Sequence, residues 1–114
     1  MSRRTRRPRP TRRAYAPIFA ALGDETRLAL IDRLADGEPC SIARLTEGTR
    51  LTRQAVTKHL RVLEGARIVR STRSGRESLF ELDPEPIRGI REYADIVSAH
   101  WDGALARLKA FVEE

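Results

Sequence analysis

The chain has 114 residues, enough for one domain with one hydrophobic core and too few for two. Its 22 Lys and Arg outnumber 16 Asp and Glu, which gives a net charge of +6, and its single cysteine, Cys40, excludes an intrachain disulfide. No stretch of about 18 apolar residues predicts a membrane-spanning helix. We therefore expect a cytoplasmic protein with a polyanionic partner.

The positive charge is concentrated in residues 1–13, which hold seven Arg and no acidic residue. Removing these charges leaves the rest of the chain, residues 14–114, with a net charge of −1. Because the tail is highly charged and has no apolar side chain beyond Met1 and two Pro, we expect it to be disordered. It is either a solvated N-terminus or an arm that adds phosphate or minor-groove contacts to a DNA complex.

Residues 14–114 are predicted to form one domain that begins with three short helices. The first covers residues 14–22 and is apolar. The second covers residues 24–37 and buries a stripe of four apolar side chains: Leu28, Leu30, Ile31 and Leu34. The third covers residues 41–48 and buries Ile42 and Leu45. Side chains suited to N-cap positions stand before the second, third and following helices: Asp24, Ser41 and Thr52.

The fourth predicted helix, residues 52–66, has a polar side and an apolar side. At about 100° per residue, the polar side holds five candidate DNA-binding residues: Arg53, Gln54, Thr57, Lys58 and Arg61. A short helix, a turn with a glycine and a helix with a polar outer side are typical of a helix-turn-helix, here at about residues 41–66. Gln54 and Lys58 are the leading candidates for base edges, and Arg53 and Arg61 for phosphates. The alternative is an ordinary solvated helix face.

Residues 68–82 predict a β-hairpin beside this helix. Two strands, residues 68–73 and 76–82, flank the dipeptide Ser74-Gly75, which suits a tight turn. The hairpin end carries Arg70, Arg73 and Arg76, and a wing of this kind would place Arg73 and Arg76 over the DNA backbone or in the minor groove. Charges that only keep a hairpin end soluble are the alternative.

A long helix is predicted from about residue 84 to 112, with Gly103 as a candidate bend. Apolar residues recur in it at spacings of three and four, as in a coiled-coil seam. One small core cannot cover this stripe, so we expect it to pair with a second copy, together with the helix at residues 14–22. Folding back on its own domain is the alternative. The candidate dimer interface is Ile87, Ile90, Val97, Trp101, Leu108 and Phe111.

The chain from about residue 16 to 114 resembles the bacterial arsenic-repressor (ArsR) family. Three segments carry the resemblance: LGDETRLALIDRLADGE, LTRQAVTKHLRVLEGARIV and SGRESLFELDP. The resemblance implies a mainly helical winged helix-turn-helix fold with about five helices, a small β-hairpin and a long C-terminal dimerisation helix. It further implies a homodimeric repressor that binds double-stranded DNA sequence-specifically, at an inverted-repeat operator near its own promoter.

The resemblance does not extend to the metal sites of the family. Metal-sensing members carry a Cys-x-Cys pair where this chain has Ser41 and Ala43, and the spacing of Asp95 and His100 does not match the second family site. We therefore predict no metal ion and no other cofactor, and the inducer stays unassigned. Cys40 is expected to be a small buried side chain.

His59 lies on the apolar side of the fourth helix, which favours an internal hydrogen bond over the DNA contact that a histidine makes here in some family members.

Enzymatic activity is not expected, because the sequence has no Ser/His/Asp set, glycine-rich phosphate loop or ligand cluster. The main alternative to a regulator is a nonspecific DNA-architectural protein driven by the Arg-rich tail. A third possibility is a protein-binding module that keeps the fold without contacting DNA.

Overall fold

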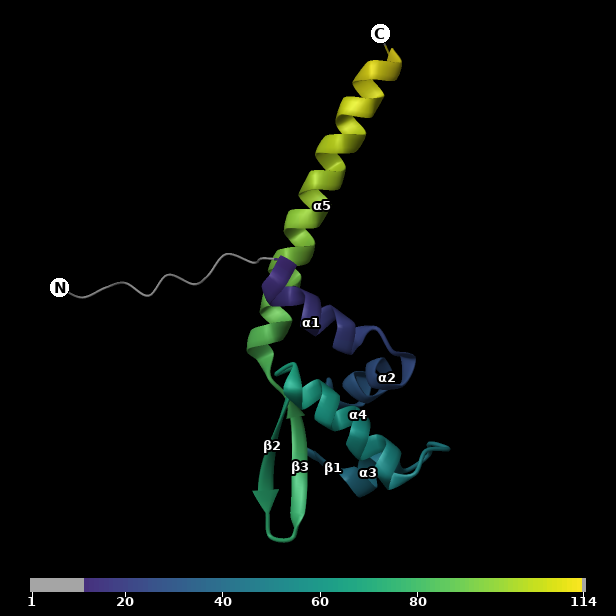
Figure 1. Cartoon of the computed structure of the whole chain (residues 1–114), viewed down its shortest axis with the longest axis vertical. Helices are drawn as coiled ribbons and strands as arrows, with labels where there is room; N and C mark the ends of the chain where they lie inside the picture. The colour runs from purple at the N-terminus through teal and green to yellow at the C-terminus, as the bar shows by residue number, and fades with distance from the viewer. Residues whose placement is uncertain (1–11, 114) are drawn as a thin grey trace, which may run out of the picture.

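The structure is a computed structural model that describes residues 12–113. Its elements in chain order are α1 (Arg12–Leu22), α2 (Glu25–Leu34), β1 (Cys40–Ser41), α3 (Ile42–Thr46), α4 (Arg53–Gly65), β2 (Val69–Ser74), β3 (Glu77–Leu82) and α5 (Pro84–Glu113). The predicted winged helix-turn-helix fold with five helices and a long C-terminal helix is confirmed (Figure 1). Residues 1–11 of the predicted tail lie outside the described residues. Arg12 and Arg13 form the start of α1, two residues earlier than predicted.

The three predicted N-caps are confirmed, and they set where the helices of the motif begin. The Asp24 carboxylate accepts a hydrogen bond from the Arg27 amide at 3.0 Å, and the Ser41 hydroxyl accepts one from the Arg44 amide at 3.1 Å. The Thr52 hydroxyl does the same for the Ala55 amide at 3.1 Å, at the start of α4. Each bond satisfies an amide that the first helical turn leaves without a partner.

The sheet has three strands in the order β1-β3-β2, so the predicted two-stranded hairpin is incomplete. The two residues of β1 pair antiparallel with β3, Cys40 opposite Phe80 and Ser41 opposite Leu79. A two-residue strand has too little alternation to be recognised in a sequence. The predicted turn is also wrong by one residue: Ser74 pairs with Glu77, which leaves Gly75-Arg76 as the loop.

The position of Gly75 explains this register. Its φ is 62°, which a glycine adopts without strain and which the first central position of a type II′ hairpin turn requires. Placing Ser74 in the loop would put the glycine at the second central position instead. Arg76 therefore projects from the turn itself rather than from a strand.

The core lies between α2, α3, α4 and the sheet. Its largest fully buried side chains are Phe80, Leu34, Leu45, Leu60, Leu63, Ile68, Val56 and Val69. The predicted stripe of α2 is correct for Leu30 and Leu34 and wrong for Leu28, which is 46% exposed. Residues two positions apart on a helix are separated by about 200° around its axis, so Leu28 and Leu30 point to opposite sides.

α5 runs as one helix through Gly103, and much of its length extends away from the domain (Figure 1). Its predicted interface residues range from half-buried to widely exposed in the single chain: Ile90 is half-buried, whereas Trp101, Leu108 and Phe111 are 63%, 59% and 75% exposed. The alternative that the stripe folds back entirely on its own domain is therefore wrong. Within residues 12–113, no helix combines the length and hydrophobicity that crossing a membrane requires.

α1 and α5 approach each other closely at Gly89. The Tyr15 ring lies over this glycine and contacts the Tyr93 ring, with centroids 5.6 Å apart, and Phe19 lies 5.7 Å from Tyr93. A Cβ atom on Gly89 would lie 2.8 and 2.9 Å from two ring carbons of Tyr15 and closer still to its hydroxyl. Gly89 therefore fixes how α1 packs against α5.

Replacing Gly89 with valine should displace α1, because the added side chain overlaps the Tyr15 ring. We expect a loss of about 2 kcal/mol in the free energy of unfolding, measured by urea denaturation, and faster amide hydrogen exchange in α1. Gly103→Val is the matched control, because the nearest atom to a Cβ there is the end of the flexible Arg107 side chain at 3.4 Å. Equal losses in both variants would contradict the proposed contact.

Candidate nucleic-acid interface

The exposed side of α4 carries the side chains that the sequence suggested for DNA. Arg53, Gln54 and Lys58 are exposed, whereas Val56 and Leu60 on the opposite side are fully buried. Within residues 12–113, the side chains of Arg53, Gln54 and Lys58 form no hydrogen bond or ion pair. They are therefore available to an external partner.

Thr57 and Arg61 are already engaged within the chain. The Thr57 hydroxyl donates a hydrogen bond to the Arg53 carbonyl at 2.7 Å, which leaves its oxygen lone pairs and its methyl group for an outside contact. The Arg61 guanidinium pairs with Glu64 at 2.7 Å and lies 5.7 Å from the Phe80 ring centroid. Arg61 thus lies against the wing, although part of its side chain remains exposed.

Glu64 joins the end of α4 to the first strand of the wing. Its carboxylate accepts a hydrogen bond from the Ser71 hydroxyl of β2 at 2.6 Å and one from Arg61 at 2.7 Å. These bonds, first that from Ser71 and then that from Arg61, lower the pKa of Glu64 from its usual 4.5. An ionised carboxylate therefore holds α4 and the wing together.

The stabilisation by Glu64 should depend on pH. Because the folded-state pKa lies below that of the unfolded chain, the contribution is present above the unfolded value and is lost as the pH falls through the folded value. We expect wild type to exceed Glu64→Gln in free energy of unfolding at about pH 7, and this difference to shrink between about pH 5 and pH 3. A difference that does not change with pH would contradict an ionic role for this side chain.

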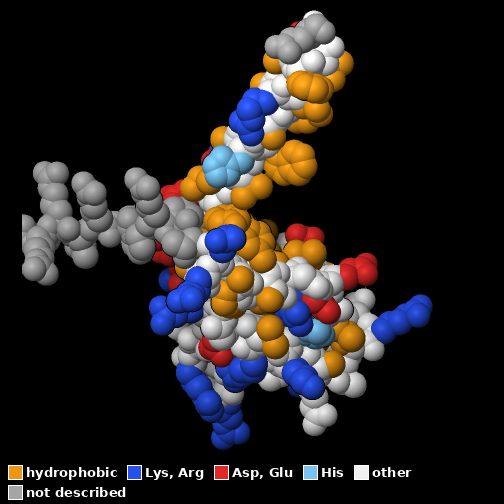
Figure 2. All heavy atoms as spheres, turned by 45° about the horizontal axis from the view of Figure 1, so that its top comes forward, with side chains coloured by type: hydrophobic (Ala, Val, Ile, Leu, Met, Phe, Trp, Pro, Cys, Tyr) orange, Lys and Arg blue, Asp and Glu red, His pale blue; other side chains and the backbone are white. Residues whose placement is uncertain are grey.

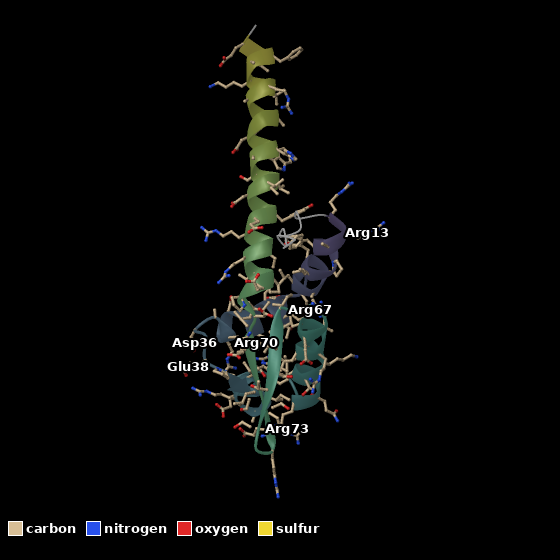
Figure 3. The ribbon with its side chains drawn as sticks, turned by 90° about the vertical axis from the view of Figure 1, so that its left-hand side faces the viewer. Arg13, Asp36, Glu38, Arg67, Arg70 and Arg73 are labelled. Carbon is tan, nitrogen blue, oxygen red and sulfur yellow. The ribbon has the colours of Figure 1, made fainter. Side chains whose placement is uncertain are left out.

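The wing tip adds cations on the same part of the molecule. Arg73 and Arg76 are exposed, whereas Arg70 pairs with Glu81 at 3.1 Å. Figure 3 shows Arg70 and Arg73 following each other along the wing. Arg76 and Arg53 line one small hollow of about 220 Å³, so the wing turn and the start of α4 face a common space. Figure 2 shows Lys and Arg side chains along the lower edge of the globular part, and hydrophobic side chains along α5.

His59 points toward α2 rather than toward the exposed side of α4. Its Nδ1 lies 3.4 Å from an Arg27 guanidinium nitrogen and 3.9 Å from the Asp24 carboxylate. The Arg27 guanidinium also donates to the Ala21 carbonyl at the end of α1. This placement agrees with the prediction that His59 makes an internal hydrogen bond rather than a DNA contact.

Sequence reasoning missed Arg33, which holds the turn of the motif. From α2, its guanidinium donates hydrogen bonds to the carbonyls of Leu45, Glu47 and Arg44 at 2.8, 2.9 and 2.9 Å. It thereby satisfies carbonyls that the end of α3 leaves without helical partners. An arginine on the outer side of α2 gives no sequence signal of this contact. Arg50, exposed in the turn, is a further cation that the sequence analysis did not assign.

Removing the guanidinium of Arg33 should loosen this turn. We expect Arg33→Met to lower the free energy of unfolding by about 1.5 kcal/mol, because three carbonyls lose a charged donor. Urea denaturation measures the loss. Arg88→Met is the control, because within residues 12–113 the Arg88 guanidinium pairs only with Glu85, in its own exposed helical turn. The free energy of unfolding of this variant should fall by no more than about 0.5 kcal/mol. Comparable losses would show that Arg33 does not hold the turn.

Cys40 is buried in β1, as expected. Across the described part of the chain, no group of three or more His, Cys, Asp or Glu side chains is arranged to hold a metal ion.

The fold and this interface together define a winged helix-turn-helix DNA-binding protein. A profile of the helix-turn-helix domain matches residues 22–72. The HTH-type transcriptional regulator Rv2034 of Mycobacterium tuberculosis is 35% identical over 85 residues, which are 75% of this chain and 78% of that protein. The structure of an ArsR-like transcriptional regulator from Rhodococcus sp. RHA1 superposes on this one with a TM-score of 0.78 and 31% sequence identity. The match covers 90% of this chain and 93% of that chain.

A third similar structure, at 18% identity and a TM-score of 0.62, is the homodimeric winged helix-turn-helix DNA-binding domain of Mb0332 from Mycobacterium bovis. The match covers 80% of this chain and 84% of that domain, and at this identity it supports the fold alone. The chain belongs to the ArsR family of helix-turn-helix transcriptional regulators. It is accordingly a DNA-binding regulator rather than an enzyme.

Proposed function

We propose that the protein is a cytoplasmic, homodimeric repressor that binds double-stranded DNA sequence-specifically, at an inverted-repeat operator near its own promoter. The observation that carries the proposal is the exposed side of α4. Gln54 and Lys58 are exposed there without a hydrogen bond or ion pair within residues 12–113, on the helix that follows the turn, and Arg76 of the wing shares a hollow with Arg53 at the start of the same helix. Free amide and ammonium donors on such a helix are suited to base edges in a major groove.

Each candidate side chain has a distinct role in this proposal. Gln54 and Lys58 contact base edges, and Thr57 meets an edge or a thymine methyl group. Arg53 contacts a phosphate, and Arg61 uses its exposed guanidinium edge for the same purpose while it remains paired with Glu64. The wing residues Arg73 and Arg76 reach the backbone or the minor groove.

Dimerisation is supported by the apolar face of α5. The exposed side chains Val97, Trp101 and Leu108 lie on one side of the helix, and a contiguous apolar surface of this kind marks an interaction site. A second copy offers the same face, so a two-fold pair buries both. Two protomers then present two copies of α4, which matches an inverted repeat. A dimer seated on a promoter represses by excluding polymerase.

We also propose that the chain belongs to the subgroup without the metal-binding Cys pair. Ser41 caps α3 through its hydroxyl, and Ala43 offers no ligand atom.

A binding selection against randomised duplex DNA at about 150 mM salt tests the proposal. It should be run with the full chain and with a chain that lacks residues 1–11, because Arg12 and Arg13 belong to α1. We expect an enriched inverted repeat with both proteins. Binding without enrichment that disappears with the tail would instead identify a DNA-architectural protein. Failure to bind DNA in either form would identify a protein-binding module.

A further inference from the structure

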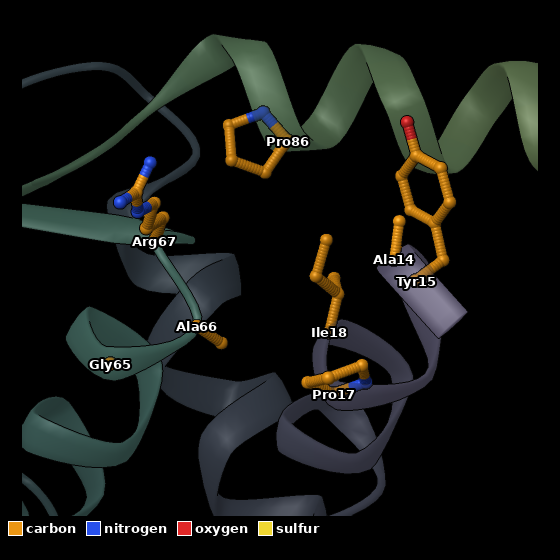
Figure 4. Close-up of a pocket in the computed structure, with 8 residues that line it drawn as sticks. All are labelled: Ala14, Tyr15, Pro17, Ile18, Gly65, Ala66, Arg67 and Pro86. Carbon is orange, nitrogen blue, oxygen red and sulfur yellow. The ribbon is translucent and has the colours of Figure 1, made fainter. Parts of the chain in front are cut away.

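A hollow of about 340 Å³ lies where α1, the turn after α4 and the start of α5 meet (Figure 4). Ile18 of α1 and Pro86 of α5 form apolar walls, and Gly65 forms part of the α4 side. Figure 4 shows Arg67 on one side of the space and Tyr15 on the other. The volume is at the small end of the range for ligand pockets.

Arg67 occupies a backbone position that glycine usually fills. The Arg67 amide donates to the Glu64 carbonyl at 2.9 Å, and the Ile68 amide donates to the Leu63 carbonyl at 3.0 Å. This pair of bonds is the Schellman motif at the end of α4, in which the residue after the C-cap adopts a positive φ. The φ of Arg67 is 61°, and it is the one non-glycine residue with a positive φ among residues 12–113.

The Arg67 side chain is exposed, and within residues 12–113 its guanidinium has no hydrogen bond or ion pair that would offset this strain. Arg67 nevertheless lines the hollow. A residue that holds a positive φ without such a compensating bond points to a functional role. An arginine is also an uncommon lining for an otherwise apolar surface.

We propose that this hollow binds a small molecule with a flat apolar body and one carboxylate. The apolar body lies against Ile18 and Pro86, and the carboxylate pairs with Arg67. The planar guanidinium matches a carboxylate with two parallel hydrogen bonds, which favours this anion over an amide or an alcohol. The inference goes beyond the proposed function: ligand binding does not depend on it, whereas an effector role for the ligand rests on it.

The position of the hollow makes it a candidate effector site. Its walls come from α1 and α5, which carry the dimer contacts, and from the turn that ends the recognition helix α4. A ligand here bears on the angle between α4 and α5, and therefore on the spacing of two recognition helices in a dimer. Any such coupling is reciprocal between ligand and DNA.

Naphthalene-2-carboxylate, followed by amide chemical shifts of the full chain, tests the proposal. We expect saturable shifts at residues 14–18 and 65–67 with a Kd of about 1 mM, which is reasonable for a ligand of this size. Naphthalene-2-carboxamide has the same shape without the charge and should bind at least about tenfold more weakly. Equal binding of the two compounds would overturn the assignment to a carboxylate.

Two variants separate binding from folding. Arg67→Gly removes the guanidinium and places a glycine at the positive φ. It should therefore weaken binding of naphthalene-2-carboxylate by at least about tenfold, while the melting temperature of the protein stays equal or rises. Gly65→Leu should also abolish binding, because a Cβ there meets no atom within 4 Å and the longer side chain fills the hollow.

Undiminished binding in Arg67→Gly would overturn the proposal. The absence of saturable shifts with wild type would do so as well, including the case in which a second copy fills the hollow in the dimer. These readouts involve no DNA, so failure here leaves the proposed DNA-binding function untouched, and failure of operator binding leaves this site untouched.

Discussion

The double substitution Trp101→Ala with Leu108→Glu is expected to convert the proposed dimer to a monomer. Both side chains are exposed in the single chain and lie on the apolar side of α5. Burial of such a side chain contributes about 1.5 to 3 kcal/mol, and a two-fold interface counts each loss twice. The new glutamate adds an unpaired charge at the same surface. Sedimentation velocity at micromolar concentration should therefore report the monomer mass.

The loss of the dimer should carry over to DNA. With only one recognition helix per particle, affinity for an intact inverted repeat should fall by at least about 100-fold, because the second half-site no longer binds as part of the same particle. Ala106→Glu is the matched control, since it adds the same charge on the opposite, exposed side of α5. If the double mutant still sediments as a dimer, the interface lies elsewhere.

Substitution of Gln54 or Lys58, the leading base-edge candidates on α4, should reduce specificity rather than general DNA affinity. We expect Gln54→Ala and Lys58→Ala each to weaken operator binding by about 1 to 3 kcal/mol, with little loss on random duplex, because a contact to a base edge exists only at the right sequence. Titration of both DNAs at one salt concentration measures the difference.

Arg88→Ala serves as the control for this experiment, because it removes a cation from α5 rather than from the exposed side of α4. It should leave both affinities nearly unchanged. Equal losses on operator and random DNA in the Gln54 and Lys58 variants would show that these side chains contact the backbone and do not read bases.

The helix-turn-helix could be predicted well because it depends on local rules. The N-caps at Asp24, Ser41 and Thr52 act within three residues of their partners, and the two sides of α4 follow from helical periodicity. The exposed stripe of α5 was visible for the same reason: Trp101 and Leu108 are seven residues apart, so they share one side of the helix.

The contacts that position the interface could not be predicted, because they join side chains of different helices and strands, whose relative placement depends on the tertiary fold. Arg33 reaches the carbonyls of α3 from α2, and Ser71 of the wing reaches Glu64 of α4. Nothing in the local sequence of either residue records its partner. The brief strand at Cys40 was missed because its pairing with Phe80 depends on the tertiary fold.

The spacing of the two half-sites tests the central claim most directly. Once the operator is selected, about five base pairs inserted between its half-sites turn one of them to the opposite side of the duplex. A rigid dimer held by α5 cannot then place both copies of α4, so we predict that affinity falls by at least about 100-fold and recovers when about ten base pairs are inserted. Affinity that does not depend on the insertion would contradict sequence-specific binding by a two-fold dimer.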